Sequence, residues 1–268
     1  MEKIMEESQA GFSVNGKDIL RGVNIAIEEG AAVAVTGANG SGKSSLIKLL
    51  AGICEPQTGK IHRNFNSHAY VPEHFPEHLP FTIKKYLDLL REMSGGRKKE
   101  EVSHYTTLFG LDSFLDVPLK KCSKGTKQKA GFIQALLKEA DVLFLDEPFT
   151  GLDENAVQSA VDLLLERRGR KTMVFTLHEF ALVQQLATHM AVIEEGRLVS
   201  FSAVQKKSGI MLITCQFSAP LPENVLQADK LAERTYRLTV QKGESDKVLR
   251  QILRNGGHII EVRAGEAQ

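Results

Sequence analysis

The stretch of residues 37 to 44 constrains this chain more than any other part of its sequence. It reads Gly-Ala-Asn-Gly-Ser-Gly-Lys-Ser and fits the phosphate-binding pattern G-x-x-x-x-G-K-[ST] at every position. An apolar, partly β-branched run precedes it at residues 31–36, and residues 45–50 have helical apolar spacing. The context is therefore strand, glycine loop and helix, which disfavours the alternative of a chance glycine turn.

This loop predicts a set of contacts to a nucleotide triphosphate. Its glycines allow successive backbone N–H groups to turn toward phosphate oxygens, and the following helix directs its positive dipole end at the same anion. Lys43 is expected to reach the β- and γ-phosphates, and the Ser44 hydroxyl to ligate Mg²⁺. The candidate nucleotide-binding residues of the segment are Gly37, Ala38, Asn39, Gly40, Ser41, Gly42, Lys43, Ser44 and Ser45.

Two carboxylates follow a second buried strand. Residues 142–145 read Val-Leu-Phe-Leu and are followed by Asp146 and Glu147. Because ligands bind at the carboxyl ends of strands in open α/β sheets, we expect Asp146 to hold the Mg²⁺ shell and Glu147 to polarise an attacking water. Residues 171–177 form another apolar run, so His178 at its end is expected to face the γ-phosphate. A surface turn, and for His178 a purely structural role, are the alternatives.

Composition and charge narrow the class of protein. The chain has 268 residues and a hydrophobic fraction of 42%, enough for one large α/β domain and a small appendage. Its net charge of +1 argues against bulk nucleic acid as the main partner. The sequence shows no signal peptide and no apolar window of membrane-spanning length, and its 3 cysteines lack metal-ligand spacing. We expect a soluble, cytosolic chain with free thiols.

The segment before the phosphate loop predicts a β-hairpin. Residues 12–28 alternate apolar and polar types around Asn15-Gly16, a dipeptide typical of tight turns. Such a layer can hold an adenine ring, with Phe12 or Val14 as the candidate contact. For Phe12, packing within the hairpin is an equal alternative.

A mostly helical insertion is expected after the loop. Helical spacing predicts helices at residues 83–93 and 100–109, separated by a basic loop at 95–99. Ser123 is well placed to cap a third helix. The histidines of the proline-rich segment 72–80, His74 and His78, suggest a metal site, but the prolines forbid a helix that would place both on one face.

The motifs GANGSGKSS, CSKGTKQK, VLFLDEP, GLD and TLHE, in that order, resemble those of the nucleotide-binding subunit of the ATP-binding cassette (ABC) family. The resemblance covers roughly residues 8–205. It implies that Lys43 and Ser44 belong to the Walker A motif, that Asp146 and Glu147 are the Walker B aspartate and the catalytic base, and that Asp153 and His178 are the D-loop aspartate and the switch histidine.

The resemblance also implies a head-to-tail dimer that holds two ATP molecules at its interface. Ser123 and Gly125 of one subunit then contact the γ-phosphate bound by the other. Such a contact exists only in the closed dimer, so ATP binding favours closure.

Three features depart from the family pattern. In the signature L-S-G-G-Q, Cys122, Lys124 and Thr126 replace the first, third and fifth residues. Glu73 stands where the family has a glutamine; its carboxylate can reach Mg²⁺ but adds negative charge near the γ-phosphate, which predicts slow turnover. Val14 aligns with the position that usually stacks on adenine, which predicts loose base selectivity.

The chain changes character after about residue 205. Strand-like runs at 210–215, 235–240 and 258–262 and a helical pattern at 246–253 predict a small α+β module. It resembles the short C-terminal extensions of some bacterial cassette subunits. A regulatory or dimer-supporting role and a simple cap over the core are both open for it.

Together these observations predict an α/β P-loop NTPase cassette fold over residues 1–205, with an antiparallel β layer and a helical subdomain at about 73–140, followed by an α+β extension at 206–268. We expect a Mg²⁺-dependent ATPase, dimeric and homodimeric in the simplest case, at the cytoplasmic face of the membrane, with separate membrane-spanning permease subunits and no nucleic acid as partners. The alternatives are a soluble cassette ATPase that acts on a cytosolic or nucleic-acid assembly, and a regulator that barely hydrolyses ATP.

Overall fold

The computed structural model describes residues 3–76, 79–93, 99–204, 210–218 and 220–265. The chain forms two compact units, Met1–Val204 and Gln205–Gln268. Within the described ranges, no helix is long and apolar enough to cross a membrane. His78, positions 95–98 of the expected basic loop and the expected domain boundary at 205–206 lie outside the described residues.

A six-stranded sheet forms the centre of the first unit, in the order β5-β6-β7-β3-β8-β9. All its neighbours pair in parallel except β8 and β9. The expected strands before the phosphate loop, before Asp146 and before His178 are confirmed, and a surface turn at 142–145 is excluded because these residues are buried. The strands are β3 Ala32–Thr36, β5 His68–Val71, β6 Val142–Leu145, β7 Thr172–Thr176, β8 His189–Glu194 and β9 Arg197–Ala203.

This sheet is buried on both faces, as expected of parallel strands between two layers. Along β3, Val33 and Val35 pack into one core and Ala32 and Ala34 into the other. The first core also contains α1, and the second contains α4, α5 and α6. These helices span Lys43–Leu50, Lys124–Leu137, Glu154–Arg167 and Phe180–Leu186.

An antiparallel sheet of order β2-β1-β4 covers α1. The expected hairpin is confirmed but begins at Lys3 rather than at residue 12, and its turn places Asn15 and Gly16 at φ 52° and 76°. From β4, Arg63 donates to the carbonyl oxygens of Leu49 and Leu50, at 2.6 and 3.1 Å, at the C-terminal end of α1. The strands are β1 Lys3–Val14, β2 Lys17–Glu28 and β4 Thr58–Arg63.

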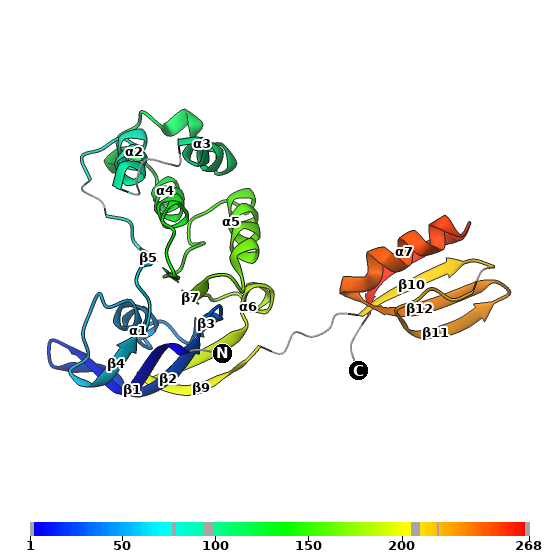
Figure 1. The fold of residues 1–268 in the computed structure, drawn as a ribbon, viewed down its shortest axis with the longest axis horizontal. Coiled ribbons are helices and arrows are strands. Elements are labelled where there is room, and N and C mark those ends of the chain that lie inside the picture. The colour runs from blue at the N-terminus through cyan, green and yellow to red at the C-terminus, as the bar shows by residue number, and fades with distance from the viewer. Residues whose placement is uncertain (1–2, 77–78, 94–98, 205–209, 219, 266–268) are drawn as a thin grey trace. The chain divides into compact units, whose positions relative to one another are not determined.

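The helical layer lies on the side of the unit opposite the antiparallel sheet (Figure 1). Besides α4 it contains α2 and α3, and both pack on α4. Ser123 caps α4 as expected, because its side chain accepts a hydrogen bond from the backbone N–H of Thr126 at 3.1 Å. The further elements are α2 Ile83–Met93, α3 Lys99–Leu108 and the 3₁₀ turns η1 Asp112–Phe114 and η2 Leu119–Lys121.

The second unit is a four-stranded antiparallel sheet of order β11-β12-β10-β13. One helix, α7, lies along one face of it (Figure 1). The three expected strands and the helix are confirmed, whereas β11 was not anticipated. The elements are β10 Ile210–Gln216, β11 Val225–Ala232, β12 Thr235–Gln241, η3 Lys242–Glu244, α7 Ser245–Arg254 and β13 His258–Gly265.

Candidate functional site

The phosphate loop joins the end of β3 to the start of α1, and two of its positions require glycine. A Cβ at Gly42 would lie 2.8 Å from a side-chain carbon of Leu20, and the residue has φ 107°. At Gly37 a Cβ would lie 2.1 Å from the carbonyl oxygen of Ile193. Only glycine combines this backbone conformation with so close an approach of neighbouring chain. The loop geometry therefore follows from the glycines of the motif.

Two polar groups of the loop lie in its interior. Lys43 is 6% exposed, and its Nζ donates hydrogen bonds to the carbonyl oxygens of Gly37 and Ala38 at 3.0 Å each. The Oγ of Ser41 is buried and has no hydrogen-bond partner among the described residues. A buried hydroxyl without a partner is costly, as is an ammonium group that meets only carbonyl dipoles. Phosphate oxygens would satisfy both groups, so the loop fits the ligand that its sequence predicts.

Asp146 links the end of β6 to the end of β7 and to the start of α1. Its Oδ1 accepts hydrogen bonds from Ser44 Oγ at 3.1 Å and from Thr176 Oγ1 at 3.0 Å, and its side chain is almost fully buried. Thr176 Oγ1 in turn accepts from the backbone N–H of Glu147 at 2.6 Å. This role of Thr176 was not predicted from the sequence, where its only signal is its place in the TLHE motif, two residues before His178.

Glu147 occupies a strained position at the end of β6. Its backbone has φ 45°, in the left-handed region that non-glycine residues rarely adopt. Its Oε1 lies 2.7 Å from His178 Nε2, and its Oε2 accepts from Thr150 Oγ1 at 3.1 Å. Partial burial alone would raise the pKa of Glu147, but the hydrogen bonds from His178 and Thr150 and the charges of His178 and Lys43 lower it overall. The carboxylate is thus held ionised and oriented.

A cleft of about 750 Å³ has Lys43, Ser44, Glu147 and His178 in its lining, whereas the buried Ser41 and Asp146 are not lining residues. It brings together most of the residues predicted from sequence, including Glu73, which approaches from the segment after β5. Val14 is exposed at the hairpin turn and is not among the lining residues, and Phe12 packs against the core below the antiparallel sheet. The cleft is lined by Ile19, Asn39, Gly40, Gly42, Lys43, Ser44, Ser45, Glu73, Glu147 and His178.

The signature segment and Asp153 lie outside this lining. A Cβ at Gly125 would lie 2.2 Å from the carbonyl oxygen of Gly151, so the two backbones touch. Asp153 caps α5 through the N–H of Ala156 and forms an ion pair with Lys129 of α4 at 2.6 Å. Within one chain, the signature end of α4 is therefore tied to the segment that follows Glu147.

The donors around Ser44 and Asp146 match the requirements of Mg²⁺. No group of three or more His, Cys, Asp or Glu side chains among the described residues could hold a metal ion by itself. Mg²⁺ does not need such a cage, because it keeps several waters and takes one or two carboxylates together with substrate phosphates. The hydroxyl and carboxylate pair, with Glu73 in the same cleft, fits that pattern.

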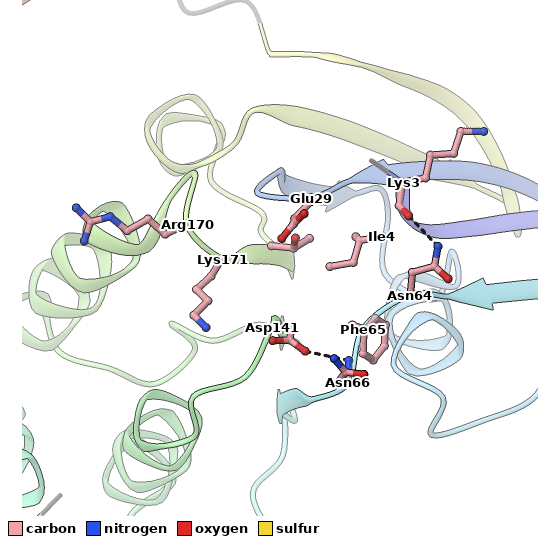
Figure 2. A pocket seen from close by; sticks show the side chains of 10 residues that line it. Lys3, Ile4, Glu29, Asn64, Phe65, Asn66, Asp141, Arg170 and Lys171 are labelled. Carbon is pink, nitrogen blue, oxygen red and sulfur yellow. Dashed lines mark hydrogen bonds between the residues drawn. The ribbon is translucent and has the colours of Figure 1, made fainter. Parts of the chain in front are cut away.

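A second cavity, of about 320 Å³, lies at the opposite ends of the parallel strands (Figure 2). Asp141 precedes β6 there, and its Oδ2 accepts from the backbone N–H groups of Asn66 and Ser67 at 2.9 and 3.0 Å. These two bonds lower the pKa of Asp141 and occupy its carboxylate. Ligands of open α/β sheets bind at the carboxyl ends of strands, so the first cleft is the candidate functional site.

A glycine loop between a parallel strand and a helix, with a carboxylate pair at the end of another parallel strand of the same sheet, defines a P-loop nucleoside triphosphatase. Residues 20–150 match the family described as ABC transporter. YthP of Bacillus subtilis, an uncharacterized ABC transporter ATP-binding protein, is 32% identical over 86% of this chain and 100% of its own length. The chain belongs to the ABC transporter family, as an ATP-binding subunit that hydrolyses ATP.

Other relatives agree with this assignment. The zinc transport system ATP-binding protein TroB of Treponema pallidum is 31% identical over 69% of this chain and 77% of its own. Among solved structures, an ATP-binding subunit of an ABC transporter has a TM-score of 0.67 and 25% identity, and the match covers 75% of this chain and 90% of the other. The predicted resemblance and fold class are confirmed.

Proposed function

We propose that the chain hydrolyses ATP in a Mg²⁺-dependent reaction and couples the closure of a dimer to separate membrane-spanning subunits. The observation that carries the proposal is that Lys43, Ser44, Glu147 and His178 line one cleft. Asp146 joins them through its hydrogen bond with Ser44. We assign the cassette to residues 1–205 and the extension to 206–268.

Each group of the cleft has a role that its contacts support. Lys43, Ser41 and the loop N–H groups bind the phosphates, while Ser44, Asp146 and Glu73 would hold Mg²⁺, which neutralises charge on the phosphate oxygens. Glu147 takes the proton of the attacking water. The hydrogen bonds from His178 and Thr150 orient that carboxylate, and Lys43 supplies positive charge to the developing anion.

We propose a second copy of the cassette as the first partner. Ser123, Gly125 and Asp153 do not line the cleft of their own chain, and Ser123 and Asp153 are exposed. Such residues are available to complete the cleft of a facing subunit, and a homodimer is the simplest arrangement because one chain carries both halves of the site. The altered residues Cys122, Lys124 and Thr126 flank the retained serine and glycine.

The second partner is a permease, and it places the ATPase at the cytoplasmic face of the membrane. Relatives are named as ATP-binding proteins of transport systems, among them TroB and the zinc import protein ZnuC. Within its described ranges this chain has no helix able to span a membrane. The near-neutral charge gives no support to a nucleic-acid partner.

The proposal is tested with the variant Glu147→Gln, which keeps the shape of the side chain and removes the base. Phosphate release should fall by about 10² or more, the size of general-base contributions, while ATP binding is retained. The exposed Glu154, at the start of α5, provides the matched control Glu154→Gln, which should hydrolyse at the wild-type rate.

The same variant tests the coupling. Purified with ATP from detergent-solubilised membranes of its native host, Glu147→Gln should bring down a polytopic membrane protein in stoichiometric amount. Recovery from the soluble fraction only, with a ribosome, nucleic acid or no partner, would refute the proposed coupling to a membrane permease. It would not contradict the proposed ATP hydrolysis. Equal phosphate release by wild type and variant would instead indicate a regulator that binds ATP with little hydrolysis.

A further inference from the structure

The C-terminal unit presents a free strand edge. In its sheet of order β11-β12-β10-β13, strand β13 pairs with β10 on one side, and no described strand of the unit pairs with its other side. Residues 260–264 are all exposed, with Ile260 at 51% and Val262 at 40%. Unpaired backbone N–H and C=O groups along such an edge are a template for another strand.

The two edges of this sheet differ. Strand β11, at the opposite edge, has two register irregularities in its pairing with β12, one near Val225 and one near Lys230. Bulges of this kind twist an edge and hinder pairing. Strand β13 has one irregularity in its pairing with β10, between Ile259 and Glu261, and pairs without interruption from Glu261 to Gly265. The regular, exposed edge segment is therefore residues 261–265 of β13.

The side chains of β13 divide between two faces. Val262 lies opposite Ile213, whose side chain is in the core below α7, so Val262 is on the helix face. Glu261 and Arg263 lie opposite Thr214 and Leu212 and are on the other face. An antiparallel partner strand would meet one carboxylate and one guanidinium, two positions apart, on that face.

This spacing is self-complementary. When two copies of β13 pair antiparallel about a two-fold axis at Val262, Glu261 of each copy lies directly opposite Arg263 of the other, and the two Val262 side chains meet on the helix face. An axis at Glu261 or at Arg263 would instead oppose like charges, which destabilises a pair. The charges thus select one register.

We propose that β13 is a homodimerisation edge, at which a second copy of this chain adds its own β13 to form a continuous eight-stranded sheet with both α7 helices on one face. The occupant is a second copy because the charge pattern of residues 261–263 complements itself in the antiparallel direction. The contact needs no nucleotide, so it holds two subunits together independently of the ATP cleft.

The test is sedimentation of the nucleotide-free full chain over a range of concentrations. Wild type should dimerise. Glu261→Arg should raise the dissociation constant of the dimer about tenfold or more, because each of the two opposite-charge pairs becomes a like-charge pair. Arg263→Glu should weaken it similarly. The double variant Glu261→Arg/Arg263→Glu exchanges the charges and should restore the dimer. This rescue separates the proposed pairing from a loss of folding.

A matched control lies away from β13. Glu233, in the turn between β11 and β12, is exposed, and Glu233→Arg makes the same charge change without touching β13, so it should leave the dimer unchanged. A wild-type chain that is monomeric without nucleotide would overturn the proposal. So would a Glu261→Arg dimer as tight as wild type, a double variant that does not restore the dimer, or equal weakening by Glu233→Arg.

Discussion

The Nε2 of His178 lies 2.7 Å from the Oε1 of Glu147, so a strand end of β7 orients the carboxylate delivered by the neighbouring β6. The contact is one of the bonds that hold the pKa of Glu147 below its usual range. Glu147 and His178 are about thirty residues apart in the sequence, but the strands that precede them, β6 and β7, are neighbours in the sheet. The two motifs therefore act together at one site.

His178→Ala should shift the acid limb of the ATPase pH profile to higher pH. The loss of the hydrogen bond and of the positive charge raises the pKa of Glu147, so the carboxylate becomes protonated at a pH where the wild-type base is still ionised. The measurement is phosphate release at saturating ATP over a pH series from about 3.5 to 8, which begins below the usual pKa of a glutamate. A control with His189→Ala, at the start of β8, should keep the wild-type limb. An unshifted limb in His178→Ala would count against the assigned role.

Glu73→Gln should raise the rate of ATP hydrolysis. Glu73 lines the cleft with Lys43 and Glu147, and the substitution removes a negative charge from the neighbourhood of the phosphates while keeping an oxygen for Mg²⁺. Steady-state phosphate release at saturating MgATP measures the effect. A rate equal to or below that of wild type would show that the carboxylate does not limit turnover.

Gly125→Ala should destabilise the first unit by roughly 1–3 kcal/mol, as overpacking commonly does. The added methyl would lie 2.2 Å from the carbonyl oxygen of Gly151, so the start of α4 and the segment after Glu147 must move apart. Chemical unfolding gives the free energy of unfolding. Gly243→Ala is the matched control, because a Cβ there meets nothing within 4 Å. Equal stability of the two variants would refute the close contact.

Glu7→Gln should remove a pH dependence from the stability of the fold. Burial raises the pKa of Glu7 from 4.5 to about 8, against the opposing charge of Arg63, and both carboxylate oxygens lack a partner among the described residues. Between these two pH values the native state holds a proton that the unfolded chain has released. Wild-type stability should therefore fall as pH rises through this window, by up to about 1.4 kcal/mol per pH unit.

The measurement for Glu7 is the free energy of unfolding at pH 5.5, 6.5 and 7.5, a series inside that window. Glu7→Gln should give a flatter curve than wild type. Glu6→Gln, which alters the adjacent, partly exposed carboxylate, should keep the wild-type slope. Parallel curves for wild type and Glu7→Gln would show that Glu7 is not protonated in the native state.

The motif residues of the cleft could be predicted from sequence because the chemistry requires particular types at fixed local spacing. Lys43, Ser44, Asp146 and Glu147 follow from a glycine loop and from a strand that ends in carboxylates. The contacts of Thr176 could not be predicted from sequence, because they depend on β7 lying between β3 and β6. No local sequence pattern determines that strand order.

Strand β11 and the burial of Glu7 could not be predicted from the sequence, for different reasons. Strand β11 carries Gln227, Asp229 and Lys230 in an exposed edge, so it lacks the apolar alternation that marks a half-buried strand. Burial of Glu7 rather than of Glu6 depends on the register of β1, which shifts near Gln9, a residue at φ 52°. A one-residue change of register reverses which side chains face the core.

The contact of Arg63 with Leu49 and Leu50 gives the phosphate loop a mechanical asymmetry. The two hydrogen bonds attach the C-terminal end of α1 to the antiparallel sheet, whereas the N-terminal end of the helix continues from the glycine-rich phosphate loop. Force applied to a phosphate group bound at the loop would therefore be resisted at the C-terminal end of α1 and carried into the antiparallel sheet.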